Sequence, residues 1–271
     1  MSIAEKLTTV AENQQKVYEA GYEKGKAEGG GGSYDEGYTA GIAAGVEQGK
    51  QAERGAFWDS LQLPDGSAQN YSYAFARWPD NILKPTHNVY PTNGQNMFDN
   101  FNSGRTPYTD LTTLFKGLGV KLDTSRCTNF NQMFYYAWIN RVPEIDTRAA
   151  SDISGLFLAA TRVVTIDKII LKDDGSQILY KDSYGQCFYN CTSLVNVEFE
   201  GVIGSNIDFR QSKKLSAKSM ASTVEHLSTT TSGKTAFFSQ EAVNNADWST
   251  TEYESWSALV DTKPNWSFTL A

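Results

Sequence analysis

The first apolar residues of the chain follow the spacing of a coiled coil. Steps of four and three residues alternate along a seam that consists of Ile3, Leu7, Val10, Gln14 and Val17. This spacing predicts a helix over 2–28 that associates with copies of itself, and a polar residue within the seam can set register or oligomeric state. A single amphipathic helix packed on its own domain is the alternative interpretation.

Glycine then recurs at every fourth residue. Gly29–Ser33 must break the first helix, because each glycine costs about 1 kcal/mol in a helix interior; the same five residues match a standard engineered linker unit, so a natural and an engineered origin both stay open. On a second helix, one face would carry Gly37, Gly41, Gly45 and Gly49. Bare backbone on one face favours close helix packing. Residues 1–56 are thus predicted to be a helical stalk for attachment and oligomerisation, with a joint at 29–33; a glycine-rich tether is the alternative.

In the middle of the chain, short segments that each contain a phenylalanine alternate with short runs that have the pattern of β-strands. The runs at 142–146, 164–171 and 195–199 have the period of two that is typical of strands. From Phe134 to Phe157 the spacing is 157 − 134 = 23 residues, within the roughly 20–29 residues of repeats that stack to form a common core. A repeat solenoid is therefore predicted over 97–210, with a core of Phe115, Phe134, Phe157, Phe188, Leu194, Val197 and Phe199.

Two further segments flank the predicted repeats. Residues 57–96 combine prolines, glycines and aromatic residues, which predicts an ordered cap on the first repeat; an aromatic glycan site is the alternative. Residues 211–271 read as an α/β C-terminal cap. In it, Ser216 starts a helix to about Leu227, a strand covers 234–239, a second helix covers 251–261, and Trp266, Phe268 and Leu270 alternate in a last strand.

Several short motifs resemble a known class of proteins. Cys127–Phe134 and Phe188–Leu194 resemble BspA-type leucine-rich repeats. Both chain ends, through 4–21, 206–209, 230–234 and 263–266, resemble repeat-containing proteins encoded in phages and prophages of gut Firmicutes. The resemblance implies an α/β fold: a helical stalk, a short leucine-rich-repeat solenoid and an α/β cap. It also implies a phage tail or baseplate appendage, such as a tail fibre.

Composition narrows the chemistry. The net charge of −7 argues against broad binding to nucleic acid, and no apolar run approaches the ~20 residues of a membrane-spanning helix. Cys127, Cys187 and Cys191 are interpreted as core residues, not as a disulfide or metal set. His87 and His226 lie in no catalytic motif, and Gly233–Thr235 lacks the earlier glycine of a phosphate-binding loop. No catalytic, cofactor or metal site is predicted, although Asp146, Asp167, Glu198 and Asp208 follow strand runs and could line one face.

These observations predict a non-enzymatic structural and interaction protein of the virion, made in the host cytoplasm without an amino-terminal export signal. We expect a homotrimer that attaches to other tail or baseplate proteins through its first helix and recognises a bacterial surface glycan or protein. A bacterial surface adhesin of the same repeat class is the alternative. A glycan hydrolase is a third and weaker interpretation, because paired carboxylates cannot be located from sequence spacing.

Overall fold

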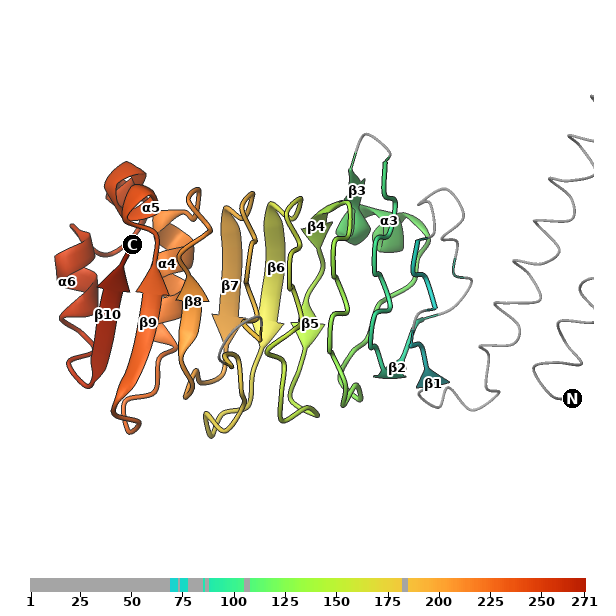
Figure 1. The fold of residues 1–271 in the computed structure, drawn as a ribbon, viewed down its shortest axis with the longest axis horizontal. Coiled ribbons are helices and arrows are strands. Elements are labelled where there is room, and N and C mark those ends of the chain that lie inside the picture. The colour runs from blue at the N-terminus through green and yellow to red at the C-terminus, as the bar shows by residue number, and fades with distance from the viewer. Residues whose placement is uncertain (1–68, 73, 78–84, 86–87, 105–107, 182–184) are drawn as a thin grey trace, which may run out of the picture. The chain divides into compact units, whose positions relative to one another are not determined.

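The computed structural model describes residues 69–271, apart from residue 73 and residues 78–84, 86–87, 105–107 and 182–184 (Figure 1). The chain divides into two compact units, Met1–Pro64 and Asp65–Ala271. All described residues belong to the second unit. The predicted stalk over 1–56, with its seam and its glycine stripe, lies outside the described residues.

Short parallel strands follow one another along the second unit (Figure 1). The first pair joins β1 (Gln69–Asn70) to β2 (Pro91–Asn93). The central sheet contains β3 (Thr109–Asp110), β4 (Ile139–Val142), β6 (Thr165–Ile170), β5 (Ile145–Asp146) and β7 (Asn196–Glu200). A third sheet contains β8 (Ile207–Phe209), β9 (Lys234–Phe238) and β10 (Trp266–Leu270). Each of these strand pairs is parallel.

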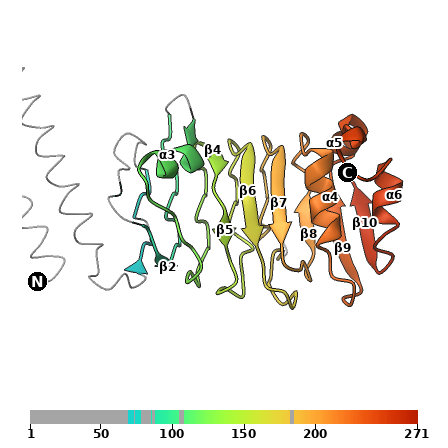
Figure 2. The same cartoon turned by 180° about the vertical axis from the view of Figure 1, so that it is seen from behind.

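The helices of the described residues are few and short. They are α3 (Leu111–Gly117), α4 (Ala217–Glu225), α5 (Gln240–Asn245) and α6 (Trp256–Val260), with a single 3₁₀ turn, η2 (Trp248–Thr250). Each α-helix starts at a side chain that accepts a backbone N–H of its first turn, as preferred N-cap residues do. Three of the four lie at the C-terminal end of the unit, where α4 covers one side of the strands (Figure 2).

The predicted fold class is wrong. Instead of an α/β chain with a long helical stalk and a leucine-rich-repeat solenoid, the described residues form mostly parallel sheets, with a sheet curled into a half-barrel and four short helices. The physical reason lies in the links between strands. They turn tightly through residues with positive φ, such as Asn100 (51°), Ala159 (55°) and Asn190 (59°). Left-handed backbone interrupts a helix, and asparagine tolerates it better than most residues do.

The core is a column of rings that we call the phenylalanine stack. Successive turns contribute Phe75, Phe98, Phe134, Phe157, Phe188, Phe209 and Phe238. All of these side chains are almost completely buried. The central rings are stacked nearly parallel to their neighbours: the ring centroids of Phe134 and Phe157 are 5.1 Å apart at an interplanar angle of 7°. Backbone bonds connect the same turns, for example from Phe134 N to Leu156 O at 3.1 Å.

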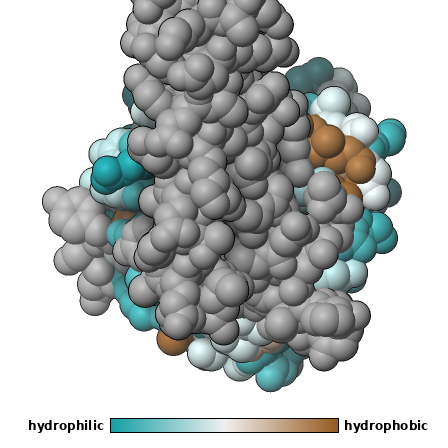
Figure 3. Space-filling view, turned by 90° about the vertical axis from the view of Figure 1, so that its right-hand side faces the viewer, coloured by the Kyte–Doolittle hydropathy of each residue, from teal (hydrophilic) through white to brown (hydrophobic). Residues whose placement is uncertain are grey.

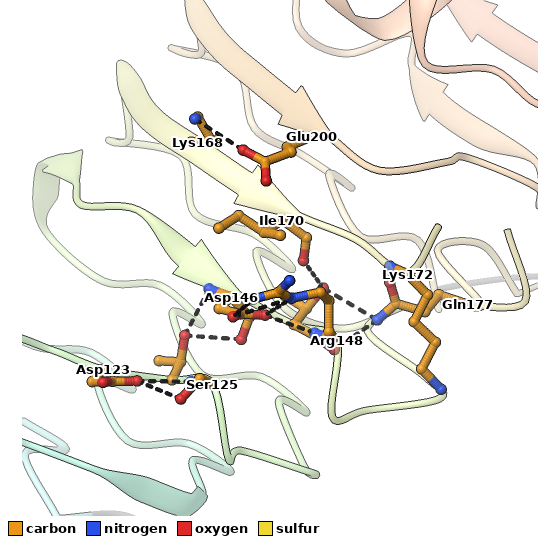
Figure 4. Close-up of polar contacts among 11 residues, drawn as sticks. Asp123, Ser125, Asp146, Arg148, Lys168, Ile170, Lys172, Gln177 and Glu200 are labelled. Atoms are coloured by element: carbon orange, nitrogen blue, oxygen red, sulfur yellow. Dashed lines mark hydrogen bonds and ion pairs between the residues drawn. The ribbon is translucent and has the colours of Figure 1, made fainter. Parts of the chain in front are cut away.

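Polar side chains satisfy the backbone where the chain turns a corner (Figure 4). The hydroxyl of Thr124 donates to Asp146 O at 3.0 Å, and the hydroxyl of the buried Thr147 donates to Ile170 O at 2.7 Å. The Gln177 amide, also buried, donates to Thr147 O at 2.7 Å. Asp146 accepts from Arg148, with Arg148 Nη2 at 2.7 Å. Because buried carbonyls need partners, these side chains satisfy the backbone where the chain leaves β5 and β6.

Helix α4 protects the edge of the central sheet. The backbone N–H groups of Val197 and Phe199 in β7 donate to the hydroxyls of Ser219 (2.8 Å) and Ser222 (3.0 Å) in α4. A helix thus occupies the position where a further strand would pair, which is one way proteins cover a sheet edge. The buried Lys263 completes the other end of α4, with Nζ 2.8 Å from Glu225 O, and burial lowers the pKa of this amine.

Candidate functional site

The predicted core residues lie inside the unit, although not all in one column. Phe134, Phe157 and Phe188 are members of the phenylalanine stack. Phe199 contacts the ring of Phe188 edge-on at 6.2 Å, and Leu194 and Val197 are completely buried beside it in the chain. Phe115 is buried as well, but it belongs to α3 and not to the stack. The seam and glycine residues of the stalk lie outside the described residues.

The cysteines are buried, as expected of core residues, and all three are free thiols. Burial raises the pKa of Cys127 to about 11 and that of Cys191 to about 12. It also raises the pKa of Cys187 well above its ordinary value. A thiol in this state is a poor nucleophile and a poor metal ligand. The second histidine, His226, ends α4 and its Nδ1 lies 2.7 Å from Ser222 O; His87 lies outside the described residues.

Three of the four carboxylates considered for one face are paired with arginine. Asp167 accepts from Arg141 Nε at 2.7 Å and also from Thr112. Asp146 and Asp208 each accept from the arginine two residues later in the chain. Glu198 is exposed on β7. Within the part of the chain that the structure describes, no group of three or more histidine, cysteine or acidic residues could hold a metal ion.

The structure brings together a set of side chains that the sequence did not single out, which we call the aromatic–arginine cluster: Tyr108, Trp138 and Arg162. Tyr108 directly precedes β3, Trp138 directly precedes β4, and Arg162 lies in the turn before β6. These strands are neighbours in the central sheet and run parallel. Parallel pairing places the starts of adjacent strands at one edge of a sheet. Three residues distant in sequence therefore lie side by side.

The guanidinium of Arg162 rests on both rings. Its central carbon lies 5.2 Å from the centroid of the Trp138 ring and 5.6 Å from that of Tyr108. The two rings meet edge to face, with centroids 5.8 Å apart at 84°. Each cation–π contact of this kind contributes about 0.5–1 kcal/mol at exposed sites and more where water is excluded. The rings therefore hold the cation in one place on the surface.

Arg162 has no anionic partner among the described residues, in contrast to the half-buried Arg210. Arg210 is paired with Asp208 at 2.6 Å, whereas Arg162 forms no hydrogen bond or ion pair with any described residue. Its Nε is shielded from solvent and unpartnered, as is Oδ1 of Asn140, the second residue of β4. Leaving a buried polar group unsatisfied costs about 1–3 kcal/mol. Such an exception calls for an explanation beyond stability.

The turn that leads to Trp138 carries two more aromatic side chains. Tyr135 and Tyr136 contact each other with ring centroids 4.5 Å apart, and partial burial together with the charge of Tyr136 raises the pKa of Tyr135. Tyr136 has φ 48° and is 43% exposed. A bulky residue in left-handed backbone is an outlier. Tyr136 thus adds an exposed ring two residues before Trp138 in the chain.

Large apolar side chains are otherwise scarce on the described surface. Exposed ones are Leu118, Tyr136, Val164 and Ile178, which come from different turns. Where Figure 3 shows described residues, hydrophilic surface predominates and hydrophobic atoms form small separate spots. None of the helices within the described ranges is long and apolar enough to span a membrane. The aromatic–arginine cluster is therefore the most distinctive chemical feature of this surface.

The sequence signal for this site can be interpreted only when the pairing of the strands is known. An aromatic residue stands directly before β3 and before β4, but this becomes meaningful only once β3, β4 and β6 are known to be adjacent. Arg148 and Arg210 each follow their aspartate partner by two residues, whereas Ala160 stands two residues before Arg162. The partner of Arg141, Asp167, is distant in the sequence, so the absence of a nearby aspartate alone does not identify Arg162 as unpaired. Comparison of this chain with protein-family models, with curated proteins and with solved structures finds no match.

Proposed function

We propose that this chain is a non-enzymatic interaction protein of a phage tail or baseplate, which presents the aromatic–arginine cluster to the bacterial surface. The observation that carries the proposal is the unpaired Arg162 guanidinium held on the rings of Trp138 and Tyr108. Aromatic residues and arginine dominate the energetics of interaction surfaces. The resemblance of both chain ends to phage-encoded proteins supports the place of action.

A stack of parallel strands suits this role physically. The backbone of each turn is fixed by its neighbours, as in the bond from Ala159 N to Tyr189 O at 2.7 Å. A binding surface built on such turns loses little conformational entropy when it meets a ligand, since preorganised side chains have less freedom to lose. The first 56 residues would form a homotrimer and attach the protein to the particle.

The test is to locate the protein on particles. Gold-labelled antibodies against the chain should bind the tail end of virions in electron micrographs, and an excess of purified chain should slow adsorption of those virions to host cells. Label on bacterial surfaces with none on particles would favour the adhesin alternative and overturn the proposal. Light scattering on the full chain measures the trimer separately; a monomeric mass would contradict self-association through residues 1–56.

A further inference from the structure

We propose that the aromatic–arginine cluster binds an anionic saccharide, with Arg162 donating hydrogen bonds to the carboxylate or phosphate group of the sugar. The inference rests on the proposed function, because it names the ligand of the same surface. The juxtaposition that carries it is a single unpaired guanidinium lying on Trp138 and Tyr108, at the common edge where β3, β4 and β6 begin.

The charge of Arg162 is left for an external anion. The chain carries a net charge of −7, and Arg141, Arg148 and Arg210 each find a carboxylate within 2.7 Å. Arg162 finds none among the described residues. Burial shields its Nε and not its terminal nitrogens. The end of the guanidinium fork, Nη1 and Nη2, is thus the part that can donate to a ligand.

The fork also determines which anions fit. A planar guanidinium donates two parallel N–H bonds to a carboxylate or a phosphate, which is stronger and more directional than a contact with a point charge. The stacking on two rings limits the rotation of the Arg162 side chain, so less side-chain entropy remains to be lost on binding. An ammonium group at the same position would lack both properties.

The neighbouring aromatic turn favours a saccharide over a simple anion. Tyr136 is 43% exposed and stands two residues before Trp138. Its ring offers a flat apolar surface on which the C–H face of a sugar can pack, and its hydroxyl can exchange hydrogen bonds with sugar hydroxyls. Tyrosine is an unfavourable residue for the left-handed φ of 48° at this position, so the backbone conformation does not explain why a tyrosine stands here. A cation on Trp138 and an exposed ring two residues away in the chain are the two kinds of group that an acidic sugar needs.

Binding should be measured by isothermal titration with the full chain. The probes are a galacturonic acid oligomer, its methyl ester as the matched neutral form, and glucose 6-phosphate beside glucose. We expect the acid form or the phosphate form to bind and its neutral counterpart to bind at least 10-fold more weakly. Binding of the galacturonic acid oligomer would identify a carboxylate as the recognised group, and binding of glucose 6-phosphate would identify a phosphate. Equal binding of charged and neutral forms would overturn the inference.

Variants assign the binding to the cluster. Arg162→Gln should weaken the anionic saccharide at least 10-fold, Arg162→Lys should retain only part of the affinity, and Tyr136→Ala should weaken the saccharide but not acetate or inorganic phosphate. Arg126→Gln removes the same charge at an exposed residue elsewhere and should leave binding unchanged. Circular dichroism checks that every variant is folded. Equal affinities of wild type and Arg162→Gln would refute the site.

Other outcomes separate this inference from the proposed function. If acetate or inorganic phosphate bound as tightly as the acidic sugars, the cluster would be a site for simple anions, and the assignment of a saccharide as its ligand would be wrong. If an acidic peptide bound more tightly than either sugar, the partner would be a protein. If antibodies labelled the virions but the chain bound no acidic sugar, the proposed ligand would be refuted and the proposed phage role would stand. Binding of acidic sugars without label on virions would overturn the phage role and leave the site intact.

Discussion

Replacing Phe157 by leucine removes one ring from the middle of the phenylalanine stack and keeps a large apolar side chain. Phe157 is completely buried, and its centroid lies 5.1 Å from that of Phe134 and 5.8 Å from that of Phe188, with interplanar angles of 7° and 9°. Aromatic pairs contribute about 0.5–1.5 kcal/mol each beyond the area they bury. Two pairs are lost, and the change of shape costs up to about 1.5 kcal/mol more. We expect a loss of about 1–4.5 kcal/mol in the free energy of unfolding.

The matched control is Phe115→Leu. Phe115 is 3% exposed and makes no ring contact with the other described residues, so only the change of shape applies and the cost should stay below about 1.5 kcal/mol. Urea unfolding of the full chain measures both variants. Tryptophan fluorescence and far-ultraviolet circular dichroism should report the same transition, and an unchanged m-value shows that the change lies in stability.

A double-mutant cycle isolates the ring pair. Phe134→Leu, Phe157→Leu and the double variant should give a coupling energy of about 0.5–1.5 kcal/mol, since residues in direct contact do not add independently. If the coupling were zero and Phe157→Leu cost no more than Phe115→Leu, burial alone would hold the turns together. The attribution of stability to ring stacking would then be refuted.

Two further substitutions test the corner and the aromatic turn. Burial alone would raise the pKa of Asp146, but hydrogen bonds from Arg148 lower it overall. The ionised carboxylate therefore stabilises the fold at neutral pH, and this contribution is lost as the pH falls below about 4. Asp146→Asn should make the urea midpoint fall less between pH 6 and pH 3 than it does in the wild type, and an equal fall in both proteins would contradict this. Tyr136→Asn should raise the free energy of unfolding by up to about 1 kcal/mol, because asparagine accepts left-handed backbone more easily than tyrosine does. Asn190 occupies the same place in its own turn, with φ 59°. A lower urea midpoint of the variant would instead show that the Tyr136 side chain contributes to packing.

Period-two runs and capping residues were enough to predict several elements. The run at 164–171 contains β6, and the run at 195–199 overlaps β7, which ends one residue later at Glu200. In β7 buried and exposed residues alternate, because alternate residues of a strand point to opposite faces and only one face is buried. Helix α4 begins after Ser216 as predicted, since the Ser216 hydroxyl accepts from Ser219 N. The alternation at the end of the chain likewise corresponds to β10. These are local signals, which act within one element.

The fold class depended on information that is not local. Phe115 precedes Phe134 by 134 − 115 = 19 residues, which suggested a repeat, yet the ring that stacks on Phe134 is Phe98, at 134 − 98 = 36 residues. The intervening residues hold β3 and α3, so the spacing of one turn is not constant. Whether a link between strands forms a helix or a tight left-handed turn depends on single residues such as Tyr136, whose φ no apolar pattern reveals.

Stability and recognition are carried by different atoms of the same turns. In the turn from Phe134 to Trp138, the Phe134 ring and the bond from Phe134 N to Leu156 O fix the path of the backbone, while Tyr135, Tyr136 and Trp138 project at least partly into solvent. Because neighbouring turns determine that path, exchange of the outer side chains leaves the interior unchanged and costs little, as surface substitutions usually do. The same stack can thus present different outer residues, and therefore different ligand specificities, on an unaltered core.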